Sequence, residues 1–138
     1  MKRKVFIFAL IVILVITGLS ACSKTGKTAG VQNPKTSLDW AGVYTGTIPA
    51  ADVSGINVRM QINKNNTYEL TYEYLDKPNT FTFNGAFKWD DTSSVIIIDI
   101  ADAPSFYKVA ENKLIQLDMK GNLITGDLAD NYVLMKNR

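Results

Sequence analysis

Few side chains in this sequence could carry out catalysis. The chain has no histidine, so the commonest general base near neutral pH and the commonest metal ligand are both missing. No motif pairs a serine or threonine nucleophile with a lysine or carboxylate base. Carboxylate pairs occur at Asp90 with Asp91 and at Asp99 with Asp102, and such pairs can bind a cation or divide acid and base roles. Both pairs lie at the ends of predicted strands, where acidic side chains normally face water. We therefore expect no enzyme activity, no catalytic residues, no metal site and no cofactor.

Three methionines could in principle bind cuprous ion through their thioether sulfur atoms. Met60, Met119 and Met135 each lie on an apolar phase or near the end of a predicted strand. Methionine at such positions usually fills gaps in a hydrophobic core. We therefore expect these side chains to pack in the core and not to bind copper.

Aromatic side chains are numerous for a chain of this size, with six tyrosines, six phenylalanines and two tryptophans. Several fall on the inward phase of predicted strands. If the strands close into a small barrel, such side chains either fill its interior or line it around one small ligand. A filled interior is the expectation. The speculative alternative is a ligand site inside the barrel made by Tyr44, Tyr68, Tyr72, Phe83 and Trp89.

The single cysteine, Cys22, lies in a context that predicts lipidation. A basic start at residues 2–4 is followed by the apolar run Val5–Thr17, and this order is typical of a signal peptide. The run is shorter than the roughly 20 residues of a transmembrane helix, so a membrane-spanning anchor is the weaker interpretation. The segment Leu19–Cys22 (LSAC) matches the bacterial lipobox at all four positions. We expect residues 1–21 to be a cleaved signal peptide and Cys22 to carry the lipid anchor.

The residues from Cys22 onward predict a tether and then one folded domain. Residues 22–37 are rich in Gly, Ser, Thr and Lys and hold few apolar groups, a composition that cannot repay its own ordering entropy. The remaining residues, 38–138, suit a single domain with one hydrophobic core. The residue after the cysteine is Ser23 and not aspartate, which implies sorting to the outer membrane of a diderm host, on its periplasmic face.

Charge argues against a nucleic-acid partner. The full chain has 15 basic and 13 acidic residues, and cleavage of residues 1–21 would remove three of the basic ones, leaving 12 basic against 13 acidic residues. A protein that binds nucleic acid needs a broad basic field, which a nearly neutral domain does not offer. The expected partners are the membrane, through Cys22, and either an envelope protein or a small apolar ligand.

Alternation of apolar and polar residues predicts that nearly all of the folded region is β-strand. In Ile56–Asn63 and Thr67–Tyr74 every second residue is apolar, the pattern of a strand with one buried and one solvated face. Asn65 and Asn66 tolerate the positive φ of a tight turn, which predicts a hairpin. Further strands are expected at Val43–Ile48, Thr80–Trp89, Val95–Ile100, Phe106–Val109, Leu114–Met119 and Tyr132–Met135. About eight short strands in so small a domain favour an all-β antiparallel barrel, which also removes free sheet edges.

Several segments, in this order, resemble the amino-terminal domain of the NlpE family of envelope lipoproteins. The resemblance rests on Asp39–Pro49, Gly55–Ile56, Asn66–Leu70, Phe81–Gly85 with Phe87 and Trp89, Leu117–Asn122 and Asn131–Leu134. These segments span the folded region. The resemblance implies a small antiparallel, lipocalin-like β-barrel, and it implies a link to copper tolerance, surface sensing and envelope-stress signalling.

A thiol pair of that family has no counterpart in this sequence. The family pattern after the proline is Cys-x-x-Cys-x-Gly-Ile, and Ala50 and Val53 stand at the two cysteine positions. Neither side chain can bind a metal or form a disulfide. Some family members also carry a second, carboxy-terminal domain, which the resemblance does not cover. We therefore expect a non-enzymatic envelope binding or stress-sensing module without the thiol chemistry. The alternative is a carrier of a small apolar or lipid-like ligand in the barrel.

Overall fold

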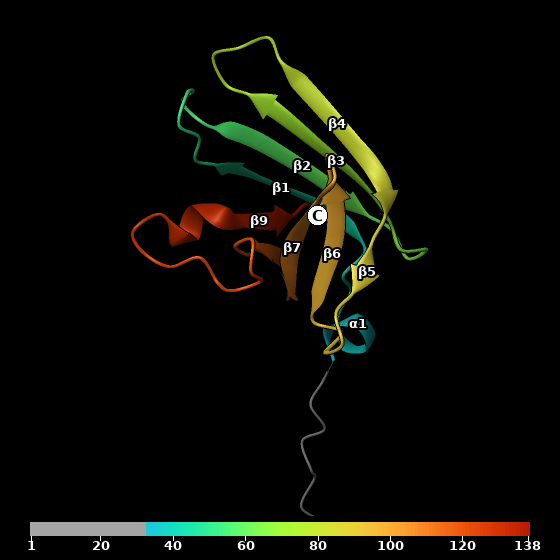
Figure 1. The fold of residues 1–138 in the computed structure, drawn as a ribbon. Helices are drawn as coiled ribbons and strands as arrows, with labels where there is room; N and C mark the ends of the chain where they lie inside the picture. Colours follow the sequence, from blue (N-terminus) through green and yellow to red (C-terminus); the bar gives the residue numbers. More distant parts are fainter. Residues whose placement is uncertain (1–32) are drawn as a thin grey trace, which may run out of the picture. The chain divides into compact units, whose positions relative to one another are not determined.

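The computed structural model describes residues 33–138, which form nine antiparallel strands and almost no helix (Figure 1). The strands are β1 (Gly42–Ile48), β2 (Ile56–Ile62), β3 (Thr67–Tyr74), β4 (Thr80–Ala86), β5 (Lys88–Trp89), β6 (Val95–Ile100), β7 (Ala103–Ala110), β8 (Lys113–Gln116) and β9 (Val133–Lys136). A short helix, α1 (Pro34–Ser37), precedes them, and a 3₁₀ turn, η1 (Ala129–Tyr132), precedes β9. Within residues 33–138, no helix is long and apolar enough to cross a membrane.

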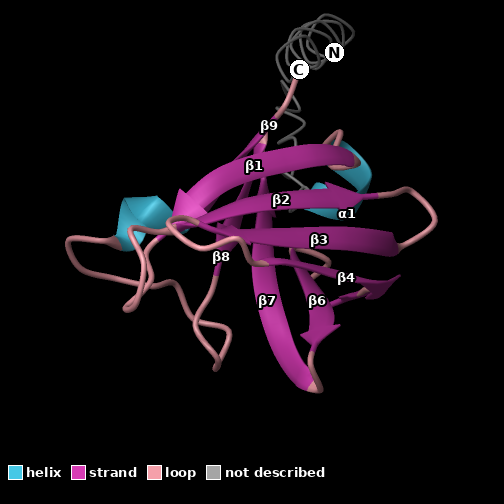
Figure 2. Cartoon of the chain, turned by 90° about the horizontal axis from the view of Figure 1, so that it is seen from above, coloured by secondary structure: helices cyan, strands magenta, loops and turns pink. Residues whose placement is uncertain are grey.

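All nine strands belong to one sheet, which curls into a nearly closed barrel. Their order is β4-β3-β2-β1-β9-β8-β7-β6-β5, and every neighbouring pair is antiparallel. The two end strands, β4 and β5, follow each other in the chain, so the polypeptide itself joins the two ends of the sheet. Figure 2 shows β6 and β7 crossing β1–β4 at a steep angle, as expected for a strongly twisted sheet that closes on itself. The predicted all-β antiparallel barrel is confirmed.

The predicted strand Thr80–Trp89 is two strands, because its halves pair with different neighbours. β4 pairs with β3, and β5 pairs with β6. The change of partner occurs at Phe87, whose N–H donates to the carbonyl of Asn66 at 2.8 Å. Three residues later, the N–H of Asp90 donates to the carbonyl of Val95 at 2.9 Å. The barrel therefore has nine strands where about eight were expected.

The hairpin turns have the backbone conformations that their residues favour. Asn66, between β2 and β3, has φ of 61°, as its side chain allows. Ala101 and Asp102, which connect β6 to β7, have φ of 49° and 65°. Positive φ at both residues of a two-residue turn matches the twist of the strands that it joins. The predicted hairpin between Ile56–Asn63 and Thr67–Tyr74 is confirmed.

Side chains fill most of the barrel interior. The core residues come from every strand except β4 and β5, and they alternate with outward residues as the sequence pattern predicts. The largest fully buried side chains are Tyr44, Met60, Ile62, Leu70, Ile96, Ile98, Tyr107, Val109, Leu114 and Leu134. No charged side chain is buried among the described residues.

The predicted core position is wrong for two of the three methionines. Met60 is fully buried, as expected. Met119 is 87% exposed, because β8 ends at Gln116 and the expected strand does not extend that far. Met135 is 54% exposed, because it lies on the outward phase of β9 beside the buried Leu134.

One end of the barrel is covered by α1 and three aromatic rings. Trp40, Phe87 and Trp89 pack edge to face, with ring centroids 5.3–6.0 Å apart. The indole N–H of Trp40 donates to the carbonyl of Lys35 in α1 at 2.9 Å. α1 itself occupies the last four residues of the stretch expected to be a tether, and Asn33 caps it by accepting the N–H of Lys35 at 2.9 Å.

Candidate functional site

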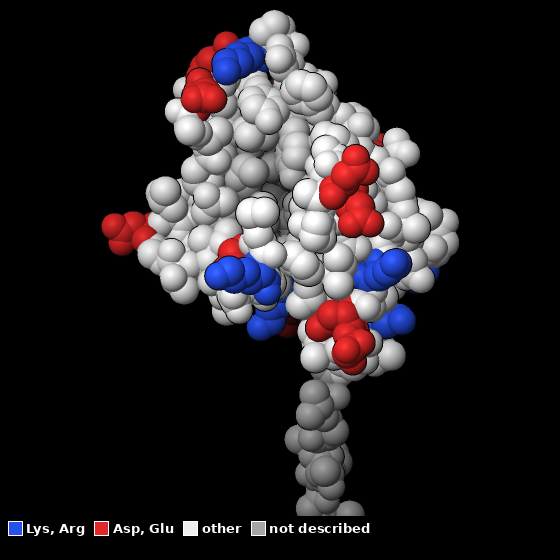
Figure 3. Space-filling model, viewed as in Figure 1, with Lys and Arg blue, Asp and Glu red and all other residues white. Residues whose placement is uncertain are grey.

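The other end of the barrel is open and aromatic. Tyr72 and Tyr74 on β3 and Phe81 and Phe83 on β4, the open-end cluster, lie on the inward face of the sheet. Their rings pack edge to face, at 6.0 Å between Tyr72 and Phe83 and 5.7 Å between Tyr74 and Phe81. Phe81 is nevertheless 47% exposed. Figure 3 shows a recess in the middle of the viewed face, lined by uncharged side chains and surrounded by charged ones.

Beneath this opening, tyrosine hydroxyls close the interior. The hydroxyls of Tyr72 and Tyr107 lie 3.5 Å apart. Burial raises the pKa of Tyr107 well above its usual value and also raises the pKa of Tyr72. The Tyr68 hydroxyl donates to the carbonyl of Asp99 at 2.7 Å and so joins β3 to β6 across the barrel. The open end is therefore a shallow recess above a packed core.

The structure divides the five residues that were candidates for an internal ligand site. Tyr72 and Phe83 are half-buried neighbours in the open-end cluster. Tyr44 and Tyr68 are buried core residues with hydroxyls bonded to backbone carbonyls, and burial raises the pKa of Tyr44 to about 12. Trp89 belongs to the aromatic group at the covered end. Among these five residues, Tyr72 and Phe83 are the two that belong to the open-end cluster.

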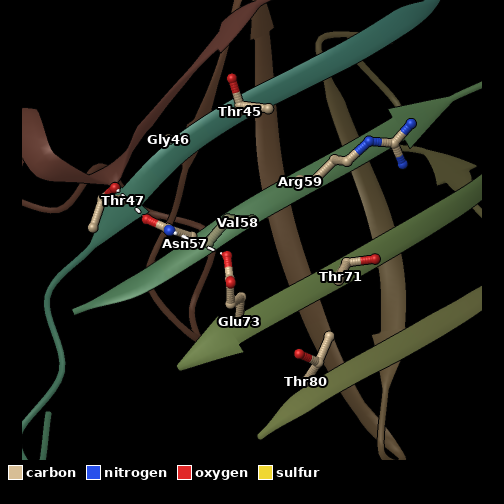
Figure 4. A pocket seen from close by; sticks show the side chains of 9 residues that line it. All are labelled: Thr45, Gly46, Thr47, Asn57, Val58, Arg59, Thr71, Glu73 and Thr80. Atoms are coloured by element: carbon tan, nitrogen blue, oxygen red, sulfur yellow. Dashed lines mark hydrogen bonds between the residues drawn. The ribbon is translucent and has the colours of Figure 1, made fainter. Parts of the chain in front are cut away.

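A second concave surface lies on the outside of the barrel, across β1–β4. This polar groove has a volume of about 550 Å³ and is lined mainly by outward-facing polar residues (Figure 4). Cross-strand register brings them together, because Thr47 lies opposite Asn57, Asn57 opposite Glu73, and Glu73 opposite Thr80. The lining residues are Thr45, Gly46, Thr47, Asn57, Val58, Arg59, Thr71, Glu73 and Thr80.

Side chains in the polar groove bond to one another. The Thr47 hydroxyl donates to Asn57 Oδ1 at 2.8 Å, and Asn57 Nδ2 donates to Glu73 Oε2 at 3.2 Å. The Arg59 guanidinium pairs with Glu69 at 3.1 Å. Hydroxyls, an amide and one carboxylate can hold a polar group by hydrogen bonds, but they supply no paired nucleophile and base. This surface was not predicted from the sequence. The polar residues that alternate with the core positions of β1–β3 could have indicated it, because they all face the outside of the barrel.

Of the carboxylates singled out in the sequence, that of Asp90 stabilises the turn that follows it. Asp90 Oδ1 accepts the N–H groups of Ser94 and Val95, both at 2.9 Å, and Asp90 Oδ2 accepts the Thr92 hydroxyl at 2.6 Å. Partial burial raises the pKa of Asp90, but these hydrogen bonds outweigh burial and leave the pKa below its usual value. The carbonyl of Asp99 accepts the Tyr68 hydroxyl. Across residues 33–138, no group of three or more Asp, Glu, Cys or His side chains is arranged to hold a metal ion.

Two further sites from the sequence are the positions of the thiol pair and the predicted lipidation site. Ala50 and Val53, at the positions of the thiol pair, lie in the connection between β1 and β2. Cys22 and the predicted signal peptide lie outside the described residues. Lipidation therefore stays a prediction.

Comparison with known proteins identifies the fold's relatives. The family profile of the NlpE N-terminal domain matches residues 44–127. A search of curated proteins gives no match. The crystal structure of a Shewanella oneidensis protein with a provisional lipoprotein assignment is 40% identical and has a TM-score of 0.71. The alignment covers 77% of this chain and 96% of that one.

A second crystal structure, of the Cpx pathway activator NlpE from Escherichia coli, shares the fold at 23% identity and a TM-score of 0.53. Its alignment covers 62% of this chain and 46% of the Escherichia coli chain, so the likeness is to about half of that protein. The family profile covers more than half of this chain and includes β2–β8 in full. The chain therefore belongs to the NlpE family through its N-terminal-type domain.

Proposed function

We propose that this chain is a membrane-anchored envelope lipoprotein whose barrel is a non-enzymatic binding or stress-sensing module. The observation that carries the proposal is the filled interior. Tyr44, Tyr107 and Met60 are fully buried in the barrel, and the polar groove lies outside it. A barrel packed with core side chains offers its surfaces to partners, which suits recognition of another envelope component.

The anchor is supported by the sequence LSAC at Leu19–Cys22 and by family membership. Two or three acyl chains on Cys22 would hold the domain at the membrane almost permanently, because each buried methylene contributes about 0.8 kcal/mol. Ser23 after the cysteine favours the outer membrane, with the barrel on the periplasmic side. Density-gradient separation of the two membranes tests that location.

Replacing Cys22 is the most direct test of the anchor. Cys22→Ala removes the acceptor of the lipid, so we expect the protein to lose its incorporation of labelled palmitate. Once the signal peptide is cleaved, the domain should leave the membrane fraction and keep its folded circular dichroism spectrum. Ser23→Ala is the matched control and should stay in the membrane fraction. A cleaved Cys22→Ala protein that still sediments with membranes would contradict the anchor.

A carrier of a small apolar ligand is the second candidate, and the open-end cluster favours it. Tyr72 and Phe83 are half-buried aromatic neighbours in this cluster, where a short apolar group could contact them. Saturable binding of a fluorescent fatty acid, weakened by Phe83→Ala and unchanged by Thr71→Ala, would support a carrier. Copper has no place in the proposal, because Ala50 and Val53 replace the thiols.

A further inference from the structure

β4 is an unprotected end of the sheet. Its sequence, TFTFNGA over Thr80–Ala86, has no charged residue and no proline. Every residue is exposed except the half-buried Phe83. Native proteins normally protect edge strands with lysine, proline, a bulge or very short length. The opposite end of this sheet follows that rule, because β5 is two residues long and includes Lys88.

The ladder with β3 shows which backbone groups of β4 point away from the barrel. Antiparallel residues alternate between bonded and non-bonded pairs. The N–H of Phe87 donates to Asn66, and the N–H of Tyr74 donates to Asn79, so the bonded pairs include Phe81 with Tyr72 and Phe83 with Leu70. The N–H and C=O groups at the alternate positions therefore point to the open edge. These positions are Thr80, Thr82, Asn84 and Ala86.

We propose that two copies of this chain pair edge to edge through β4, antiparallel about a two-fold axis. The outward groups at Thr80, Thr82 and Asn84 are symmetric about Thr82, so an antiparallel copy of the same strand can meet each donor with an acceptor. Like residues come close together in such a pairing. Because β4 has no charge, the two strands do not repel each other.

The side chains of β4 also match across this axis. With Thr82 on the axis, Phe81 lies opposite Phe83 of the second copy on the inward face. The exposed Phe81 then gains an aromatic neighbour, and the open-end clusters of the two barrels become continuous. On the outward face, Thr80 lies opposite Asn84 of the second copy, and both are polar. Attachment of both copies to one membrane, as proposed above, raises their effective concentration.

Single-cysteine cross-linking in whole cells tests this pairing with the full chain. If Thr82 lies on the axis, the Cα atoms of the two Thr82→Cys residues are about 5.5 Å apart. A short membrane-permeant bismaleimide can join two thiols at such positions. Thr71→Cys is the matched control, since Thr71 is directly opposite Thr82 on β3 and faces the same side. In the proposed dimer, two Thr71 positions are three strand spacings apart, about 14 Å. The unsubstituted chain, whose single cysteine is Cys22, gives the background.

We expect the Thr82→Cys chain to give a cross-linked homodimer roughly ten-fold above the Thr71→Cys chain, as expected for a directly opposed pair. Equal yields from the two variants would overturn the proposal. An adduct of Thr82→Cys with a different protein, in place of the homodimer, would also overturn it, because β4 would then pair with a foreign strand.

A second pair of variants separates pairing from folding. The Thr82 N–H points away from β3, so Thr82→Pro removes a donor from the edge and none from the barrel. For this test, Thr80→Cys is placed in one tagged copy and Asn84→Cys in a second, because the pairing sets these two positions opposite each other. Adding Thr82→Pro to both copies should abolish the cross-linked dimer, and adding Thr82→Ala should retain it. Both proteins should unfold cooperatively on heating. A Thr82→Pro chain that is folded and still forms the homodimer would contradict pairing through β4.

Discussion

The buried tyrosines combine apolar packing with a specific bond at the far end of the ring. The Tyr44 hydroxyl donates to the carbonyl of Trp40 at 2.7 Å, and the Tyr68 hydroxyl donates to that of Asp99 at the same distance. Each ring fills the barrel, and each hydroxyl meets a carbonyl, so burial leaves no polar atom of these side chains without a partner. Trp89 differs, because its buried indole N–H has no partner among the described residues.

Tyr68→Phe tests whether this bond across the barrel stabilises the fold. The variant keeps the ring and loses the hydrogen bond between β3 and β6, so we expect the free energy of unfolding to fall by about 1 kcal/mol. Tyr74→Phe is the control, since the Tyr74 hydroxyl makes no hydrogen bond within residues 33–138, and it should be neutral. Urea unfolding measures both. Equal stability of the two variants would mean that the bond contributes nothing.

Asp90 predicts how stability depends on pH. Because hydrogen bonds hold the pKa of the folded Asp90 below its usual 3.8, the stabilising contribution is complete above that value. It is lost as the pH falls through the lower pKa of the folded state. Asp90→Asn should therefore lower the free energy of unfolding by about 1 kcal/mol near pH 7. The effect is no larger because Asp90 is partly exposed to solvent. The difference from the unsubstituted protein should shrink below about pH 4. A constant difference from pH 7 to pH 3 in urea unfolding would contradict this.

At the scale of the element, β1 packs closely against β9. β1 pairs with β2 along its whole length and with β9, the last strand of the chain. Gly46 permits this approach, because a Cβ atom there would lie 2.8 Å from the carbonyl oxygen of Val133 and 2.9 Å from Leu134 Cδ2. The first of these is a backbone atom of β9, which cannot move without disturbing the strand pairing.

Gly46→Ala should consequently loosen the junction of β1 and β9. We expect a loss of about 1–3 kcal/mol in the free energy of unfolding, the usual cost of overpacking. Gly85→Ala is a matched strand-glycine control. Its added Cβ would meet Tyr68 Cε1 at 3.4 Å, an ordinary contact, so its effect should stay within about 0.5 kcal/mol. Thermal unfolding of the two variants compares them, and a Gly46→Ala protein as stable as Gly85→Ala would refute the steric argument.

The sequence predicted the strands where alternation was regular and failed where pairing between distant strands decides the outcome. Ile56–Asn63 and Thr67–Tyr74 alternate cleanly, and β2 and β3 match them to within one residue. The division of Thr80–Trp89 at Phe87 left no local signal, since it depends on which strand lies beside each half. The exposure of Met119 had the same cause, because apolar character alone does not end a strand at Gln116.

At the scale of the whole molecule, aromatic content predicted a rich interior but not its distribution. Tyr44 and Tyr68 became core, Trp89 joined the covered end, and Tyr72 with Phe83 remained at the open end. The curvature of the sheet determines where each of these side chains lies, and this curvature cannot be read from the order of apolar and polar residues in the sequence. The resulting barrel is packed inside, with its recess and its polar groove at the surface. That distribution supports a module that recognises partners over one that stores a ligand.

The central claim is that the chain is a lipid-anchored module with a filled barrel. Native mass spectrometry of the full chain, expressed in a diderm bacterium and gently extracted from its membranes, tests both parts in one spectrum. The account predicts a chain that begins at Cys22 and carries its acyl groups, with no other bound molecule in stoichiometric amount. A chain that keeps residues 1–21, or a barrel that retains a stoichiometric apolar ligand, would contradict it.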